Sequence, residues 1–314
     1  MAKWKPGIGF IIVWLCLSCA MNAAAGTHSK KPVRKPPNKV SFDIRLSAQY
    51  NSNVSVTELD NVSGADDRQF HLYAGVKYRT VIGPKTSLTA RASYSQTTHS
   101  KFSRFDLQTS YLSADLVRDV GKLDIGVYSS YYDSKLNRNG FISSWRVSPY
   151  IKKRFGRKVL TRLYYAYSDK NFDVFKSRNA HENEGGLSLY YFARGSKEYI
   201  QTQYAYKQVN STGPQFDYGA HKALIRYTRR LNYQKKRLRF RATYRFEQRN
   251  YNHATPSISA IRHDTRHKII GDFEMPLTKK IFGRLEYQHA INRSNLPVVN
   301  YNRDLLTATI GARF

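Results

Sequence analysis

Basic side chains at alternating positions are the residues of this sequence whose spacing points most directly to chemistry. Arg239, Arg241 and Arg245 lie two and four residues apart in one stretch, and other stretches repeat the spacing. A wall of guanidinium and ammonium groups attracts anions or acidic polypeptide segments, and rows of charged side chains give pores their ion preference. Such cations could equally fill a protein interior and pair with carboxylates there. The sequence leaves both interpretations open.

Twelve basic residues are candidates for lining an interior passage. They share one phase of a period-two pattern whose other phase is apolar, and acidic residues in that phase, such as Asp43, Glu247 and Asp272, are fewer. The candidates are Arg45, Lys77, Arg79, Arg91, Arg146, Arg162, Arg226, Arg239, Arg241, Arg245, Arg284 and Arg313. If this phase faces a lumen, the excess of positive charge favours anions.

No catalytic or metal-binding pattern stands out. His263 and His267 are four residues apart, but they lie at a predicted loop–strand junction, where this spacing does not bring them together as a helix would. We find no motif for a nucleophilic serine. The two cysteines, Cys16 and Cys19, fall in the N-terminal apolar run. We therefore expect neither an enzyme nor a cofactor.

The N-terminus has the pattern of a secretory signal peptide. Lys3 and Lys5 precede an apolar run, and Ala23-Ala24-Ala25 offers a small-residue cleavage site. We predict a signal peptide over residues 1–25 and a basic, Pro-rich periplasmic tether over residues 26–39. A membrane anchor and a lipidated Cys19 are the alternatives. A chain delivered across the inner membrane is not expected to bind nucleic acid.

The elements that must position the basic residues are β-strands. At the C-terminus, Leu306, Ala308, Ile310, Ala312 and Phe314 alternate with Thr307, Thr309, Gly311 and Arg313, so the two sets lie on opposite faces of a strand. A last strand that ends on an aromatic residue is typical of bacterial outer-membrane barrels. We expect Phe314 to act as a C-terminal assembly signal for the barrel-assembly machinery. An edge strand of a soluble sheet is the alternative.

The same alternation recurs about fourteen times. The runs are 40–50, 69–81, 87–97, 106–117, 122–132, 144–153, 158–168, 184–194, 198–208, 218–229, 237–248, 266–276, 280–290 and 303–314. Each is near the roughly 9–11 residues that cross a bilayer as a tilted strand. The phase of the fourth run shifts between Leu107 and Leu112, which suggests a bulge. We predict an all-β fold: a transmembrane antiparallel barrel over residues 40–314, closed because hydrocarbon tolerates no open sheet edge.

Loop lengths and aromatic residues predict an orientation. Short turns such as 83–85 alternate with longer connections at 51–68, 133–143, 169–183, 249–264 and 292–302, and an even strand count puts both termini in the periplasm. Tyr and Trp near the strand ends form two interfacial girdles. We expect the outer membrane of a Gram-negative cell, with lipid and lipopolysaccharide as partners, and basic loop residues such as Arg138, Arg178 and Arg262 facing lipopolysaccharide phosphates. No loop looks long enough to plug the lumen.

Two stretches resemble a known family. Ala48-Gln49-Tyr50-Asn51-Ser52-Asn53-Val54 resembles the "Tyr-Asp-Ser-Asn-Val" signature in the first strand of the surface lipoprotein assembly modifiers, and Tyr301-Asn302-Arg303-Asp304 with the residues to Phe314 is similar to their last strand. The resemblance implies a fourteen-stranded C-terminal barrel that exports surface lipoproteins or related haem-binding proteins. Asn51 replaces the usual Asp, and only residues 26–39 stand where the family has a tetratricopeptide domain. No assigned residue role can be carried over.

Two functions follow from these patterns. The first is a barrel that assists export or surface display of lipoproteins across the outer membrane, with a secreted or surface lipoprotein as client. The alternative is an anion-preferring diffusion porin with a lumen rich in Arg and Lys.

Overall fold

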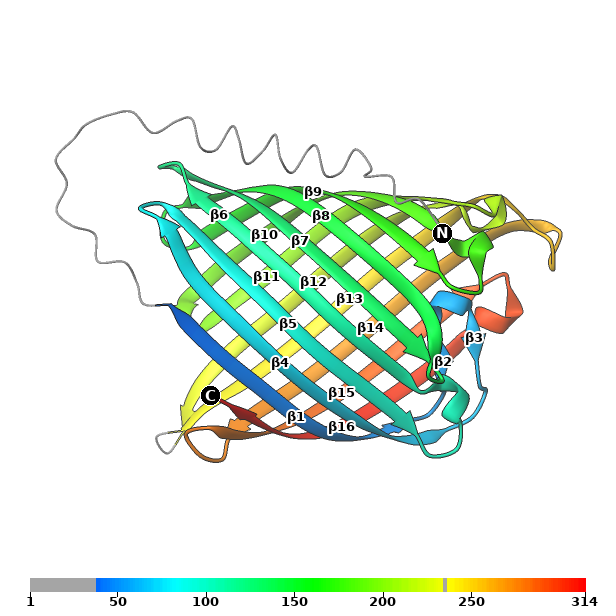
Figure 1. Cartoon of the computed structure of the whole chain (residues 1–314), viewed down its shortest axis with the longest axis horizontal. Helices are drawn as coiled ribbons and strands as arrows, with labels where there is room; N and C mark the ends of the chain where they lie inside the picture. Colours follow the sequence, from blue (N-terminus) through cyan, green and yellow to red (C-terminus); the bar gives the residue numbers. More distant parts are fainter. Residues whose placement is uncertain (1–37, 234–235) are drawn as a thin grey trace, which may run out of the picture. The chain divides into compact units, whose positions relative to one another are not determined.

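Fourteen long strands form one closed antiparallel barrel (Figure 1). The structure is a computed structural model that describes residues 38–233 and 236–314; the predicted signal peptide and residues 26–37 of the tether lie outside the described residues. The strands are β1 (Lys39–Asn51), β4 (Asp67–Gly83), β5 (Thr86–His99), β6 (Leu107–Asp119), β7 (Leu123–Leu136), β8 (Asn139–Phe155), β9 (Val159–Phe172), β10 (Ala180–Ser196), β11 (Glu198–Ser211), β12 (Tyr218–Tyr233), β13 (Lys236–Thr255), β14 (Ala260–Pro276), β15 (Ile281–Ser294) and β16 (Tyr301–Arg313). The predicted fold class is confirmed.

The apolar phase of each strand faces outward, as bilayer-spanning barrels require. On β1, the side chains of Val40, Phe42, Ile44 and Leu46 are 46–57% exposed, while the polar residues between them are less exposed. This arrangement inverts that of a soluble protein and fits a hydrocarbon surrounding. Within the described residues, no helix is long and apolar enough to cross a membrane.

Several strands continue beyond the predicted runs. The predicted loop 249–264 is mostly strand, because β13 extends for 20 residues to Thr255 and β14 begins at Ala260. The predicted loop 133–143 reduces to a tight turn at Asn137 and Arg138, both with positive φ. Backbone pairing continues past the stretch where alternation is needed, because a hydrogen-bonded ladder does not depend on a lipid boundary.

The prediction of a bulge in the fourth run is wrong. β5 and β6 pair in continuous register from Thr86↔Arg118 to Thr97↔Leu107. The apparent change of phase arises because Leu107 is an apolar residue on the inner face, where it packs against a buried cluster containing Phe141 and Phe172. The register shifts lie elsewhere, for example between Asn250 and Ala254 on β13.

The barrel closes where β1 meets β16. These strands pair from Asp43↔Arg313 to Asn51↔Leu305. Beyond that ladder, the backbones of Phe42 and Phe314 exchange two hydrogen bonds of 3.1 Å each. Phe314 therefore completes the seam, while its ring stays 56% exposed on the outside.

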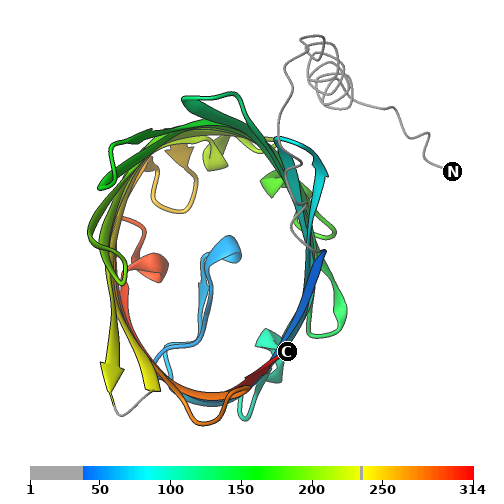
Figure 2. The same cartoon turned by 90° about the vertical axis from the view of Figure 1, so that its left-hand side faces the viewer.

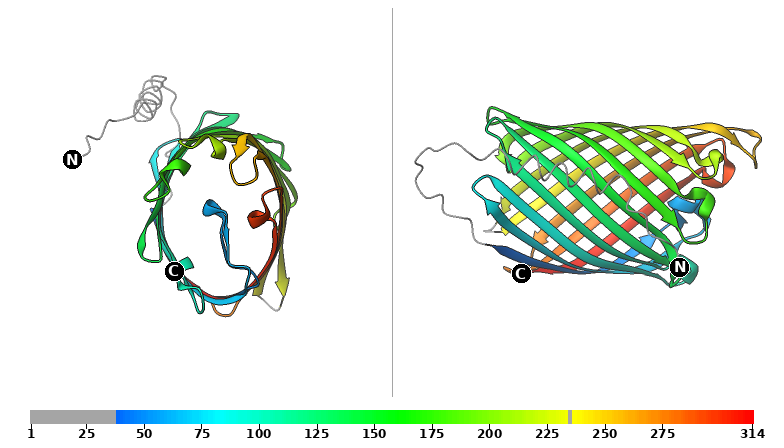
Figure 3. Two further views of the ribbon diagram at one scale, coloured as in Figure 1. Left: turned by 90° about the vertical axis from the view of Figure 1, so that its right-hand side faces the viewer. Right: turned by 45° about the horizontal axis from the view of Figure 1, so that its top comes forward.

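One loop folds into the barrel. Residues 52–66, here called the inserted loop, contain the short strands β2 (Ser55–Val56) and β3 (Asn61–Val62) and the 3₁₀ turn η1 (Thr57–Leu59). They lie inside the ring of strands when the barrel is viewed along its axis (Figures 2 and 3). We call this end of the barrel the loop end, and the end where β1 begins and β16 stops the terminal end. From the sequence, no loop is expected to be long enough to plug the lumen; the inserted loop enters the lumen without filling it (Figure 2).

Candidate functional site

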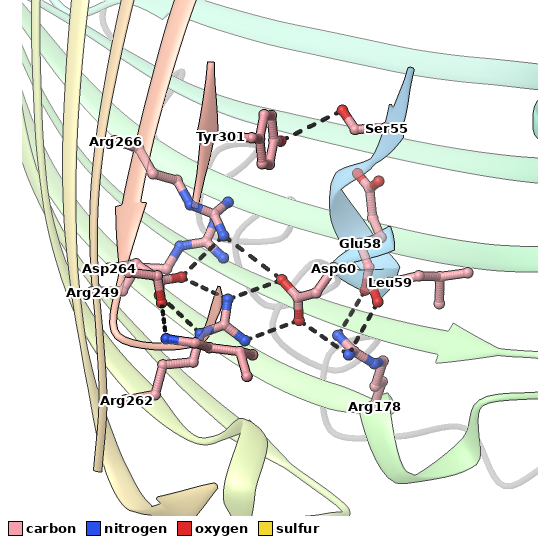
Figure 4. Close-up of polar contacts among 12 residues, drawn as sticks. Ser55, Glu58, Leu59, Asp60, Arg178, Arg249, Arg262, Asp264, Arg266 and Tyr301 are labelled. Carbon is pink, nitrogen blue, oxygen red and sulfur yellow. Dashed lines mark hydrogen bonds and ion pairs between the residues drawn. The ribbon is translucent and has the colours of Figure 1, made fainter. Parts of the chain in front are cut away.

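The tip of the inserted loop is held by a cluster of charged side chains around Asp60 (Figure 4). Asp60 ends η1 in the left-handed conformation, with φ of 53°. Arg262 of β14 donates two hydrogen bonds to the Asp60 carboxylate, at 3.0 and 2.9 Å, and Arg178 donates a third at 3.0 Å. Arg178 belongs to η3 (Lys176–Arg178), between β9 and β10. The carboxylate therefore ties the loop to two distant parts of the wall.

Arg262 is the best-satisfied cation of this cluster. It is 2% exposed, and besides Asp60 it donates to both oxygens of Asp264, at 2.8 and 2.7 Å. Its guanidinium lies 4.6 Å from the centre of the Tyr251 ring. A buried cation with paired carboxylates on two sides keeps its charge balanced, whereas removal of one partner from such a group is costly.

The electrostatics of Asp60 follow from these contacts. Burial alone raises the pKa of its carboxyl, but the hydrogen bonds and charge of Arg262, and then of Arg178, outweigh burial and lower the pKa to about 2, from an ordinary value of 3.8. Asp60 is therefore ionised at every physiological pH, and its charge is always available to hold the loop.

Apolar contacts hold the other side of the loop tip. Val56 and Leu59 pack against the buried cluster of Phe141 and Ile142 on β8 and Phe172 on β9. The rings of Phe141 and Phe172 meet edge to face, with centroids 5.7 Å apart. Burial of these side chains adds a non-directional attraction to the ion pairs. The inserted loop thus contacts wall strands on both sides of the lumen.

The base of the inserted loop is built from the two stretches that resemble the export family. Ser52 and Asp304 exchange two hydrogen bonds: the Ser52 amide donates to the Asp304 carbonyl at 2.9 Å, and the Asp304 amide donates to the Ser52 hydroxyl at 2.8 Å. Arg303 donates to the Ser55 hydroxyl at 3.1 Å. Sequence segments some 250 residues apart therefore form one structural unit at the seam.

All twelve predicted lining residues lie on the inner phase of their strands, but their partners differ. Six are paired with carboxylates: Arg45 with Asp43, Arg146 with Glu184, Arg239 with Glu274, Arg241 with Asp272, Arg284 with Glu286, and Arg313 with Glu274. The charges of these six cations are balanced locally by their carboxylate partners.

The other six have no carboxylate partner among the described residues: Lys77, Arg79, Arg91, Arg162, Arg226 and Arg245. Arg162 lies over the Tyr150 ring, at 4.1 Å, and Arg226 donates to the Thr243 hydroxyl at 3.1 Å. Arg245 stands directly opposite Lys268 on the neighbouring strand. Pairing with carboxylates therefore accounts for six of the twelve predicted residues and not for the other six.

The prediction that Arg178 and Arg262 lie in loops facing lipopolysaccharide is wrong. Both instead contact Asp60 in the interior. The alternation of Arg262, Asp264 and Arg266 continues the inner phase of β14, and this period-two signal could have revealed that the strand extends to them. Asp60 had no such signal, because its loop has no periodicity.

A small cavity of about 120 Å³ lies between the loop tip and the wall formed by β9 to β13. Among its lining residues, Glu182 pairs with Lys170 at 2.7 Å and with Lys207 at 3.0 Å. The described residues contain no group of three or more His, Cys, Asp or Glu that could hold a metal. His263 and His267 both lie on the outer face of β14, separated by about 13 Å of extended strand.

The comparisons with known proteins bear on the fold. No protein-family model and no curated protein matches the sequence. A loop L8 deletion mutant of OmpT, an outer membrane protein of Vibrio cholerae, superposes with a TM-score of 0.53 at 9% identity, over 88% of this chain and 99% of that chain. Outer-membrane expressed OmpT of Vibrio cholerae gives 0.51 at 9% identity, over 90% and 99%. The chain has the fold of outer-membrane β-barrels.

The first prediction concerns the loop tip. Asp60→Asn removes the charge that binds Arg178 and Arg262, while Arg262 keeps Asp264, so we expect the loop to detach and the barrel to remain folded. Single-molecule conductance in planar bilayers should rise and become noisier. Glu58→Gln removes the same charge from the same turn and should leave the conductance near that of the wild type. Equal traces for Asp60→Asn and the wild type would contradict the role of the ion pairs.

The second prediction concerns pH. Because the pKa of Asp60 is lowered on folding, its contribution to holding the loop is complete above about pH 4 and is lost as the pH falls from 4 towards 2. We expect wild-type conductance to rise across this interval. Asp60→Asn should lack that rise. A wild-type conductance that stays constant down to pH 2 would contradict the assignment.

Proposed function

We propose that this protein is an anion-preferring diffusion channel for small solutes in the outer membrane, with the terminal end towards the periplasm. The observation that carries the proposal is the excess of interior cations that lack a carboxylate partner among the described residues, such as Arg245 opposite Lys268. Uncompensated positive charge on a lumen wall raises the local concentration of anions and repels cations.

The size of the barrel supports passage of small solutes. Eight strands enclose an interior that side chains fill, whereas sixteen or more leave an aqueous channel, and fourteen lie between. The inserted loop narrows the loop end further. This geometry favours small ions over folded polypeptides.

The third prediction tests selectivity. Arg226→Gln combined with Arg245→Gln removes two cations that hold no carboxylate, so the barrel should stay folded. We expect the reversal potential of the wild type in a KCl gradient to indicate chloride preference, and the double variant to lose most of it. Lys85→Gln with Arg157→Gln makes the same charge change in turns at the terminal end and is the control. A wild type without chloride preference would refute the proposal.

Export of a surface protein is the second candidate function. It is favoured by the meeting of residues 48–54 with residues 301–314 at the base of the inserted loop, since these two stretches carry the resemblance to the surface lipoprotein assembly modifiers. In this role the inserted loop would have to move aside for an unfolded client.

The fourth prediction separates the two functions. Surface proteins of cells with and without this gene can be compared by protease shaving and mass spectrometry. Loss of one or two proteins from the surface, with their accumulation in the periplasm, is the result expected of an exporter. A channel should leave the surface inventory unchanged and lower the uptake of small anions.

A further inference from the structure

Four basic residues gather on the inner wall near the terminal end, outside the network of paired charges. Lys39 of β1 stands directly opposite Arg79 of β4, and Lys77 of β4 stands directly opposite Arg91 of β5. The two pairs lie two residues apart along β4, so the four side chains share one small area of the inner wall. We call these four residues the terminal basic patch. Like charges placed directly opposite each other on neighbouring strands are destabilising.

Among the described residues, acidic side chains do not compensate this repulsion. No ion pair or hydrogen bond joins the four side chains to a carboxylate within residues 38–233 and 236–314. The acids nearby are engaged elsewhere: Asp43 pairs with Arg45 at 2.5 Å and with Arg313 at 3.3 Å, and Asp115 accepts the Tyr150 hydroxyl at 2.7 Å. Arg239, Arg241, Arg284 and Arg313 of β13, β15 and β16, by contrast, each pair with a carboxylate. Two adjacent like-charge pairs without an acid therefore need another explanation than packing.

We propose that the terminal basic patch is a binding site for compact multivalent phosphate anions, of the class of inorganic pyrophosphate. This inference deepens the proposed channel function and rests on it for its biological role. An anion in the patch supplies the negative charge that relieves both like-charge pairs. In the channel, the patch would concentrate such anions at the terminal end.

The spacing of the patch favours phosphate over separate carboxylates. Neighbouring strands lie about 4.8 Å apart and alternate residues on one strand about 6.8 Å apart, so the four residues occupy roughly 10 by 7 Å. Arg79 and Arg91 are exposed to the lumen. A guanidinium binds two phosphate oxygens at once, and one phosphate group carries more negative charge and more acceptor oxygens than one carboxylate. Four cations in so small an area match a dense polyanion.

The fifth prediction is a binding measurement on the full-length protein in detergent. Isothermal titration calorimetry with pyrophosphate at low salt should give saturable binding to the wild type. Lys77→Gln combined with Arg91→Gln should weaken it at least about tenfold, because it removes one like-charge pair and half the patch. Arg79→Gln should weaken binding through the other pair. Lys85→Gln with Arg157→Gln, which makes the same charge change in the β4–β5 and β8–β9 turns, should bind as the wild type does.

Folding of the variant is checked in the same samples. Removal of repelling charges should let Lys77→Gln with Arg91→Gln unfold at a higher urea concentration than the wild type when no anion is present. Three results would overturn the inference: no saturable binding of pyrophosphate, equal binding by that variant, or tighter binding of an oligoglutamate peptide than of pyrophosphate. Calorimetry does not depend on conduction. If the wild type shows no chloride preference but binds pyrophosphate, the proposed channel function is therefore refuted and the proposed binding site is retained.

Discussion

Closure of β1 on β16 is the constraint on which the rest of the structure depends. In hydrocarbon, an unpaired backbone amide or carbonyl has no water to bond, so the sheet must meet itself along its whole edge. The ladder from Asp43↔Arg313 to Asn51↔Leu305, with the Phe42–Phe314 bonds beyond it, meets this requirement. Once the barrel is closed, every second side chain must face lipid and the others must face the interior. The polar and charged side chains of the strands therefore face the interior.

The interior then has to accommodate a large excess of positive charge. Carboxylates on the inner phase are placed where several cations converge: Glu184 receives Arg146 at 2.9 Å and Lys222 at 2.7 Å, and Asp272 receives Arg241 at 2.6 Å. Glu184 connects β10 to β8 and β12, and Asp272 connects β14 to β13. Burial of these charges costs desolvation, which only close pairing offsets. Among the described residues, Arg226 and Arg245 and the four residues of the terminal basic patch have no carboxylate partner. Charge not needed to bind strands is therefore available to a solute.

The inserted loop connects the seam between β1 and β16 to the lumen of the barrel. Its base is fastened at the seam through Ser52 and Asp304, and its tip is fastened to β14 and η3 through Asp60. Apolar contacts of Val56 and Leu59 on the other side keep it from lying flat against one wall. The Asp60 carboxylate and the apolar contacts of Val56 and Leu59 therefore together hold the loop tip in the loop end. The seam residues shape the lumen as well as closing the barrel.

The sequence by itself determined the strands, their approximate number and which phase faces outward, because period-two alternation is a local property that lipid on one side enforces. It also identified twelve inner-phase cations. Only the tertiary structure decided which of them are neutralised, since Arg239 and Arg245 have the same local pattern but only Arg239 faces carboxylates on the adjacent strand. The Asp60–Arg262 contact joins residues 202 positions apart. No local pattern encodes such a pairing, because it depends on the register and curvature of the whole barrel.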